Sequence, residues 1–386
     1  MVTHETVHRP RFALLLCLLL AALPTWLGAN DSCPDPGKWV ISGESGQFST
    51  SELLDRYASA DVILLGELHD RVEDHRWQLH LLAALHGRHD EMSIGFEMLP
   101  RRSQPTLDAW LRDELDEEEL LRESNWFEVW GHASTLYMPL FQFARMHRVP
   151  SYALNVDQAT VRRVGSEGWA AVPKNEREDV GPAAEPHAAY VEEMRDILAG
   201  HPLPDDAEPD DFLDRFVRSQ TVWDRAMAEK LAEATELHAG PAIGIVGRGH
   251  AEYGRGIPHQ LADLGIDRVV VLLPHRQGQD CLSDPPYPAH ALFGVAAGSH
   301  DGRLAPPRLG VEVSANDHGL FVTDVTSDGP AGRAGMLAED ILVRAAGRDL
   351  EKRDDLLALL DQQQTGNALT IEILRNGEPL DLVVEF

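Results

Sequence analysis

Residues 61–70 read Asp-Val-Ile-Leu-Leu-Gly-Glu-Leu-His-Asp, and this stretch decides the fold of the chain. Its apolar run, 61–65, predicts a buried strand, because a strand covered on both faces has a continuous hydrophobic sequence. Comparable apolar runs follow at 93–96, 149–154, 242–246 and 268–273. Segments with helical spacing of apolar residues separate them. This alternation predicts an α/β domain whose mostly parallel sheet has helices on both faces.

Composition sets the size of the protein and excludes one class of partner. The chain has 386 residues, of which 43% are hydrophobic, enough for two globular domains. Its 63 acidic and 34 basic residues give a formal net charge of -29. A surface this negative repels phosphate, so the composition argues against nucleic-acid binding.

The N-terminal residues predict export. Arg9 and Arg11 precede an apolar run at 12–23, which is typical of a secretory signal peptide ending at Ala29. The run is short for a membrane span, which leaves an uncleaved anchor as the alternative. We therefore expect a protein of the periplasm or cell envelope, either free or membrane-associated. Cys33 and Cys281 would remain after cleavage, as a disulfide or as two unrelated thiols.

Changes in composition along the chain divide the mature protein into two domains. We predict a signal peptide at 1–29, a large domain at 38–280, a linker at 281–306 and a small domain at 307–386. The linker assignment depends on the enrichment of this segment in Pro, Gly, Ala and His.

Polar side chains follow several of the predicted strands. Glu67 and His69 come after the first strand, Glu97 after the second, and His250 and Tyr253 after the run at 242–246. Taken singly, each is more often a structural residue than a functional one. Ligands of open parallel sheets bind beyond the carboxyl ends of the strands, so their recurrence there predicts a functional cleft.

Two kinds of chemistry suit this set of residues. His69, His250, Glu67 and Glu97 could hold zinc, manganese or cobalt, with a metal-bound water as nucleophile and a spare carboxylate, Glu67 or Glu97, as the catalytic base. Alternatively, His and Tyr side chains could ligate haem iron. His75 lies one helical turn beyond the first motif and could join either site. Spacing alone leaves both alternatives open.

Several motifs along the chain resemble those of the ChaN-like haem-binding uptake proteins. They lie in order between about residues 55 and 275: Gly66-Glu67-Leu68-His69-Asp70 with His75 and Gln78, Gly95–Pro100 with Gln104, Trp130-Gly131-His132 with Tyr137, Ala153-Leu154-Asn155, and Gly247-Arg248-Gly249-His250. The resemblance implies a ChaN/Tiki/EreA-like fold and a haem-binding protein of the cell envelope connected with bacterial iron uptake. The wider Tiki superfamily also contains metal-dependent proteases, whose paired Gly-x-x-His motifs correspond to those ending at His69 and His250.

The resemblance also implies ligands. Haem ligation in the family is thought to use a tyrosine, which points to Tyr253 first and Tyr137 second. His69, His250 and His75 are the accompanying candidates for cofactor binding. A homodimer is a further expectation.

From residue 307 onward the sequence resembles a bacterial PDZ domain, a small β-rich fold. Leu309, Gly310 and Val311 fit the loop whose backbone amides hold a peptide carboxylate while the peptide adds a strand to the sheet. A groove filled by the chain itself is the alternative.

We thus expect a haem-binding protein rather than an enzyme, with a PDZ domain that docks a partner peptide. The main rival is a metal-dependent hydrolase or peptidase whose PDZ domain recruits substrates. An adaptor that binds neither haem nor metal is the third possibility.

Overall fold

The protein is described by a computed structural model covering residue 1 and residues 33–200, 208–280, 285–297, 307–363 and 366–386. The predicted signal peptide lies almost wholly outside the described residues. Cys33 is disulfide-bonded, but Cys281, its predicted partner, also lies outside them. No helix in the described segments is both long enough and apolar enough to cross a membrane.

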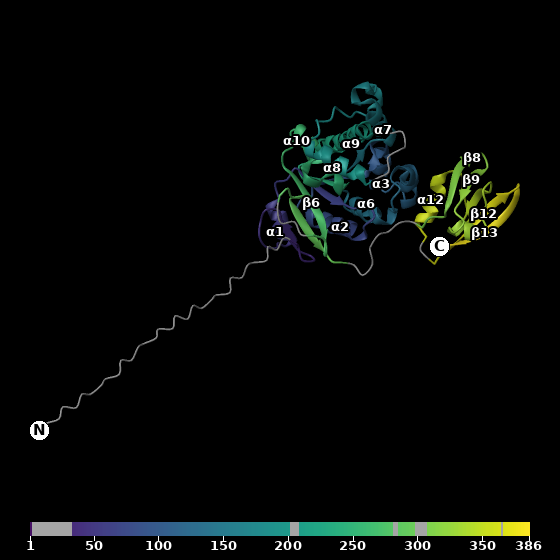
Figure 1. The fold of residues 1–386 in the computed structure, drawn as a ribbon, viewed down its shortest axis with the longest axis horizontal. Coiled ribbons are helices and arrows are strands. Elements are labelled where there is room, and N and C mark those ends of the chain that lie inside the picture. The colour runs from purple at the N-terminus through teal and green to yellow at the C-terminus, as the bar shows by residue number, and fades with distance from the viewer. Residues whose placement is uncertain (2–32, 201–207, 281–284, 298–306, 364–365) are drawn as a thin grey trace.

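The first domain is built around a seven-stranded sheet (Figure 1). Its order is β1 (Trp39–Ile41), β7 (Ala291–Val295), β6 (Val269–Arg276), β2 (Val62–Glu67), β5 (Ala242–Gly247), β3 (Ser93–Pro100) and β4 (Ser151–Asn155). Every neighbouring pair is parallel except β1 with β7. The predicted mostly parallel sheet is confirmed.

Helices cover both faces of this sheet. Successive side chains of β2 point to opposite faces, and because both sets are apolar, both faces need a cover. Ile63 and Leu65 pack with one buried cluster, and Val62 and Leu64 pack with another. The first cluster includes side chains of α1 (Thr50–Arg56), α2 (Val72–His86), α3 (Gln104–Leu111), α4 (Glu117–Glu123), α5 (Trp126–Val129) and α6 (Ser134–His147). The second includes side chains of α9 (Pro209–Leu237) and α10 (Ile257–Asp263). The remaining elements of this domain are α7 (Gln158–Glu167), α8 (Ala188–Ala199), η1 (Arg101–Ser103), η2 (Trp169–Ala171), η3 (Lys174–Glu176), η4 (Arg248–His250) and η5 (Glu252–Gly254).

The structure differs from the prediction in the segment 281–306. Part of this predicted linker is β7, which pairs with β6 and β1 inside the large sheet. The strand is short and lies in a segment rich in proline and glycine, so composition alone indicated a linker. β1, which precedes the first predicted strand, was also missed.

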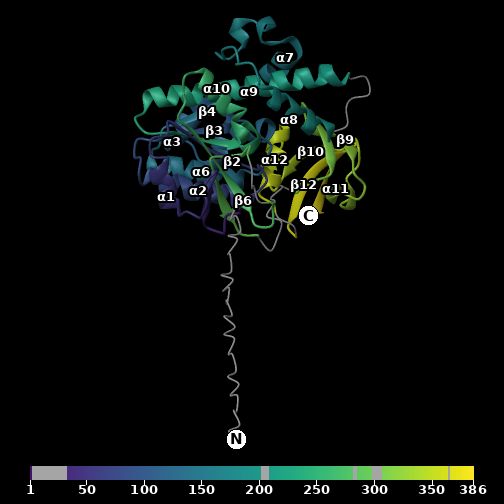
Figure 2. The same cartoon turned by 60° about the vertical axis from the view of Figure 1, so that its left-hand side comes forward.

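The C-terminal domain is a small antiparallel sheet packed against one main helix (Figure 2). Its strand order is β13 (Glu378–Glu385), β12 (Ala368–Arg375), β10 (Ile341–Ala345), β9 (Gly319–Val325) and β8 (Val311–Asn316), with β11 (Arg348–Asp349) paired to β10. The helices are α11 (Pro330–Arg333) and α12 (Arg353–Asp361). One face of α12 packs into the core of this domain through Leu356, Leu359 and Leu360.

The two domains contact each other through α12. Its last residue, Asp361, accepts hydrogen bonds from the backbone N and the Oγ of Ser134, the first residue of α6. Arg348 pairs with Glu118 of α4 at 2.9 Å. The C-terminal domain therefore lies against the helices that follow β3 in the first domain.

Candidate functional site

The candidate site lies where three neighbouring strands deliver polar side chains. Glu67, the last residue of β2, is in register with Gly247, the last residue of β5. β5 also pairs with β3, which carries Glu97. β3 continues to Pro100, so Glu97 lies within the strand rather than beyond its end. These strands bring the residues predicted for the cleft to one edge of the sheet.

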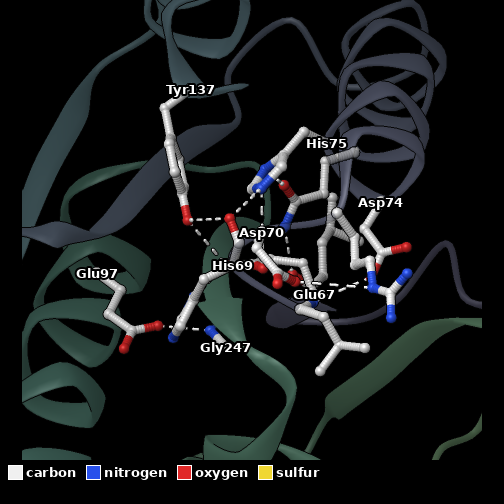
Figure 3. Close-up of polar contacts among 12 residues, drawn as sticks. Glu67, His69, Asp70, Asp74, His75, Glu97, Tyr137 and Gly247 are labelled. Carbon is white, nitrogen blue, oxygen red and sulfur yellow. Dashed lines mark hydrogen bonds and ion pairs between the residues drawn. The ribbon is translucent and has the colours of Figure 1, made fainter. Parts of the chain in front are cut away.

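The first part of the site is a carboxylate–imidazole pair. Oε1 of Glu67 lies 2.6 Å from Nδ1 of His69 (Figure 3). Glu67 is buried, whereas 34% of the His69 side chain is exposed. Burial raises the pKa of Glu67 to about 7, although the hydrogen bond to His69 acts to lower it. Burial acts to lower the pKa of His69, but the hydrogen bond and the charge of Glu67 outweigh it and raise this pKa.

The second part is a buried chain of four polar side chains. Nδ1 of His250 lies 2.7 Å from Oδ1 of Asp224, and its Nε2 lies 3.4 Å from Oε1 of Glu97. The hydroxyl of Tyr190 donates to the other oxygen of Asp224 at 2.6 Å. Burial acts to lower the pKa of His250, but the charges of Glu97 and Asp224 outweigh it and raise this pKa. The same attraction overcomes burial at Glu97 and lowers its pKa.

Asp224 and Tyr190 are site residues that the sequence motifs did not indicate. Asp224 lies on the buried face of α9 together with Val217, Thr221 and Ala228. A charged residue at the spacing of a buried helix face needs a partner, and that was the signal available in the sequence.

Gly247 connects the two parts. Its backbone N donates to Oε2 of Glu97. A Cβ atom at this position would lie 2.7 Å from Cε1 of His69 and 3.6 Å from Oε2 of Glu97. Only a glycine leaves room for the imidazole ring so close to the end of β5. Glu67, His69, Glu97 and His250 therefore share one site.

This close approach gives a direct prediction. Gly247→Ala is expected to displace His69 and to lower the free energy of unfolding by about 1–3 kcal/mol, as overpacking of a filled site does. Urea unfolding followed by tryptophan fluorescence measures the change. Gly249→Ala is the matched control, because a Cβ there meets no atom within 4 Å. Equal stability of the two variants would show that the ring of His69 does not occupy this position.

Aromatic rings form a wall beside the exposed imidazole. The ring of Trp130 makes an edge contact with His69 at a centroid distance of 4.7 Å, and the ring of His132 lies 4.9 Å away. Both residues belong to the segment between α5 and α6. Burial lowers the pKa of His132, with the charge of His69 acting in the same direction. An exposed imidazole between aromatic rings offers a surface suited to a flat ligand.

Two predicted site residues lie behind this surface. Tyr137 is fully buried, and its hydroxyl lies 3.3 Å from Oε1 of Glu67. Burial raises the pKa of Tyr137 well above its usual range. The ring nitrogens of His75 lie 3.1 Å from Oε1 of Gln78 and 3.2 Å from the carbonyl oxygen of His69. Burial lowers the pKa of His75 to about 4, so this ring is neutral.

Tyr253 is the exposed tyrosine of the set. It lies in η5, just past β5, with 38% of its surface exposed. Its backbone has φ 56° and ψ 9°, a left-handed conformation that is rare for a bulky residue. Its backbone N donates to the carbonyl oxygen of Pro288, and the guanidinium of Arg255 lies 4.7 Å from the centre of its ring.

The geometry defines the chemistry that these residues can perform. An imidazole tied at one nitrogen to a carboxylate, as His69 is to Glu67, can act as a base or as a ligand. Among the described residues, however, no group of three His, Cys, Asp or Glu side chains is arranged to hold a metal ion. His250 has partners at both ring nitrogens. The arrangement does not support the metal alternative.

The predicted peptide-binding residues lie at the start of the C-terminal sheet. Leu309 is buried, and Gly310 adopts φ 81°, which turns the chain into β8. Val311 begins β8, the edge strand of the sheet. α12 lies beside this edge strand.

Comparison with known proteins identifies both domains. The family model for haem-binding uptake proteins of the Tiki superfamily, ChaN, matches residues 53–261. The chain belongs to this family. Residues 307–386 match the PDZ domain family, and they form a PDZ domain of this ChaN-family chain. Both resemblances predicted from the motifs are confirmed.

A solved structure described as cofacial haem binding to ChaN of Campylobacter jejuni shares the fold. It is 21% identical, with a TM-score of 0.52, and the match covers 66% of this chain and 95% of that one. The serine protease Do-like HtrA of Bacillus subtilis is 32% identical over 19% of this ChaN-family chain and 16% of its own length. A probable periplasmic DegP-like serine endoprotease of Halomonas elongata is 32% identical over 17% and 14%. The chain thus spans less than a fifth of these two curated relatives.

Proposed function

We propose that this protein binds haem at the cleft of its first domain, with Tyr253 as the axial ligand of the iron, and that it acts in haem or iron uptake at the cell envelope. The observation that carries this proposal is the exposed tyrosine in a left-handed backbone conformation, three residues after His250, whose two ring nitrogens both face carboxylates. The PDZ domain, on this proposal, docks the protein to a partner peptide.

The conformation of Tyr253 supports a functional role. A non-glycine residue held in this region costs about 1–3 kcal/mol, and such residues cluster at binding sites. A structural residue would repay this cost by burying its ring, but the ring of Tyr253 is more than a third exposed. An exposed tyrosine is available to a metal centre carried by a ligand.

The surroundings of Tyr253 fit haem. The Arg255 guanidinium beside the ring could attract a propionate, although it already pairs with Glu193 at 2.8 Å. Leu68 is also more than a third exposed and follows β2, the strand next to β5. Apolar surface and a cation at one edge of the sheet are what an amphipathic porphyrin needs. Bound haem would supply an iron centre, and the protein would hold and orient it.

The other predicted ligands take supporting roles in this proposal. His69 and the neighbouring Trp130 would contact the face of the porphyrin, because these side chains form the open wall of the cleft. His250 and His75 would remain bonded within the protein and hold the ends of β5 and β2 in place. Tyr137 would stay buried against Glu67.

The PDZ proposal depends on the edge of β8. An extended peptide can add a strand there, while the backbone amides of Leu309, Gly310 and Val311 hold its terminal carboxylate. Periplasmic location follows from the predicted signal peptide at 1–29. A homodimer remains a prediction that the molecular mass in solution would decide.

Titration with haemin tests the proposed function. We expect a shifted Soret band that saturates stoichiometrically, and binding at least about tenfold weaker for Tyr253→Phe, as loss of an axial ligand implies. Tyr57→Phe is the control, because Tyr57 caps α1 and contacts His290, at the ends where β2 and β7 begin rather than where β2 and β5 end. Equal haemin affinity of Tyr253→Phe and the unmodified protein would contradict the ligand assignment. Stoichiometric uptake of manganese, cobalt or zinc instead of haem, lost in His69→Ala, would contradict the proposal as a whole.

A further inference from the structure

A hollow of about 890 Å³, open on one side, lies between the two domains, and none of the candidate-site residues line it. On one side lie α4, α5 and α6 of the first domain, and on the other lie α12 and β11 of the PDZ domain. Figure 1 shows α12 facing the first domain across this region. The lining includes neither the loop at 309–311 nor β8. The volume is that of a small-molecule site.

The walls of this interdomain hollow are strongly acidic. They carry six carboxylates and two guanidinium groups, from Glu117, Glu118, Asp349, Asp354, Asp355, Asp361, Arg122 and Arg348. Much of this charge is already engaged within the protein. Arg348 pairs with Glu118, Asp355 accepts from the backbone N of Lys352, and Asp361 accepts from Ser134.

Asp354 is the exception. It is only 4% exposed, and neither of its carboxylate oxygens has a hydrogen-bond partner among the described residues. Burial, followed by the negative charge of Glu128, raises the pKa of Asp354 to about 6. A buried carboxylate without a partner is costly, and native proteins rarely retain one without a reason. Because Asp354 lines the hollow, a cation bound there would supply the missing partner.

The remaining lining defines the rest of the ligand. Leu121, Phe127 and Met138 line the hollow from the first domain, and Ala358 lines it from α12. These side chains suit an apolar body of modest size. A bare metal ion would leave them uncovered, and no metal-binding group of three ligands occurs in the part of the chain that the structure describes.

We infer that the hollow is a binding site for a small amphipathic organic cation, whose ammonium or guanidinium group pairs with Asp354 and whose apolar body packs on Leu121, Phe127 and Met138. Such a ligand touches both domains. Its binding therefore favours the docked arrangement of the PDZ domain, since a ligand stabilises the state that binds it.

Isothermal titration with 4-phenylbutylamine and its neutral analogue 4-phenylbutanol tests this inference on the full chain. We expect the amine to bind at least about tenfold more tightly than the alcohol, the ratio that one charge-assisted hydrogen bond gives. Asp354→Asn is expected to weaken binding of the amine by about the same factor and to leave the affinity for the alcohol unchanged. Asp381→Asn, at an exposed position of β13, is the matched control and should bind as the unmodified protein does.

The design separates loss of the site from loss of the fold. Asp354→Asn keeps the shape of the side chain and removes a buried charge, so circular dichroism should show a folded protein that melts no lower. Equal affinity for amine and alcohol, or equal amine affinity of Asp354→Asn and the unmodified protein, would overturn the inference. Binding of a lysine-containing tripeptide but not of the free amine would assign the cation to a peptide side chain and overturn the assignment to a free small molecule.

Discussion

Glu97→Ala is expected to lower the free energy of unfolding of the first domain by about 3–5 kcal/mol, the cost of removing one partner from a buried ion pair. Glu97 accepts from the backbone N of Gly247 and faces the raised-pKa imidazole of His250. Without this carboxylate, the backbone donor loses its acceptor, and the buried imidazolium keeps only Asp224. The substitution therefore leaves a charge and a polar group uncompensated.

Urea unfolding followed by tryptophan fluorescence measures this loss. All eight tryptophans precede residue 307, so the signal reports on the first domain and not on the PDZ domain. Glu97→Gln keeps the shape and an acceptor for Gly247 and should lose less stability than Glu97→Ala. Glu73→Ala is the control: its ion pair with Arg76 is exposed, and its loss should cost less than about 1 kcal/mol.

The effect of Glu97→Ala should depend on pH with a defined sign. The pKa of Glu97 is lower in the folded protein than its usual value of 4.5. The stabilisation by Glu97 is therefore complete above pH 4.5 and is lost as pH falls through the folded pKa. The difference between the two proteins should shrink in acid. A difference below about 1 kcal/mol at neutral pH would show that His250 and Glu97 do not form a buried pair.

Asp361→Ala is expected to release the PDZ domain from the first domain. The carboxylate of Asp361 accepts from the backbone N of Ser134 at 3.2 Å and also from its Oγ. It thus caps the first turn of α6, where a negative charge is also favoured by the helix dipole. Loss of these bonds should weaken docking by about 1–3 kcal/mol, or roughly five- to more than a hundredfold in the docking equilibrium.

Small-angle scattering of the full chain measures the release as a larger radius of gyration. Asp381→Ala, at an exposed position on β13, is the control and should leave the radius unchanged. Ser134 lies three residues before Tyr137, whose hydroxyl contacts Glu67 in the cleft. Docking therefore contacts the same helix that supports the cleft. An unchanged radius in Asp361→Ala would show that this contact does not hold the domains together.

The sequence predicted the sheet of the first domain because its central strands are buried on both faces. Side chains of the run at 61–65 pack against helices on both faces of the sheet. A strand buried on both faces needs continuous apolar residues, and this pattern is what predicted the strand. β1 and β7 were not predicted, because each strand is short and lies near proline and glycine. β1 pairs with β7, and β7 joins the rest of the sheet through β6, a long-range pairing that no local pattern reveals.

The sequence also predicted that the residues of the candidate site lie close together. It did not predict which of them are buried and which are exposed to a ligand. Glu67 and His250 lie close because β2 and β5 end side by side, and Glu97 joins them from within β3, which pairs with β5. Which side chains face the solvent depends on packing from distant segments. The sequence placed Tyr253 ahead of Tyr137 as a candidate ligand but did not show their exposure: packing of α6 buries Tyr137, and the turn after β5 exposes Tyr253. The interdomain hollow likewise needs two domains in contact, and periodicity within either one cannot show it.

Resonance Raman spectroscopy of the haemin complex tests the central claim most directly, because it identifies the atom bound to iron. We expect phenolate vibrations from a tyrosine ligand in the unmodified protein and in Tyr57→Phe, and their loss in Tyr253→Phe. A spectrum of histidine ligation, unchanged by Tyr253→Phe, would contradict it.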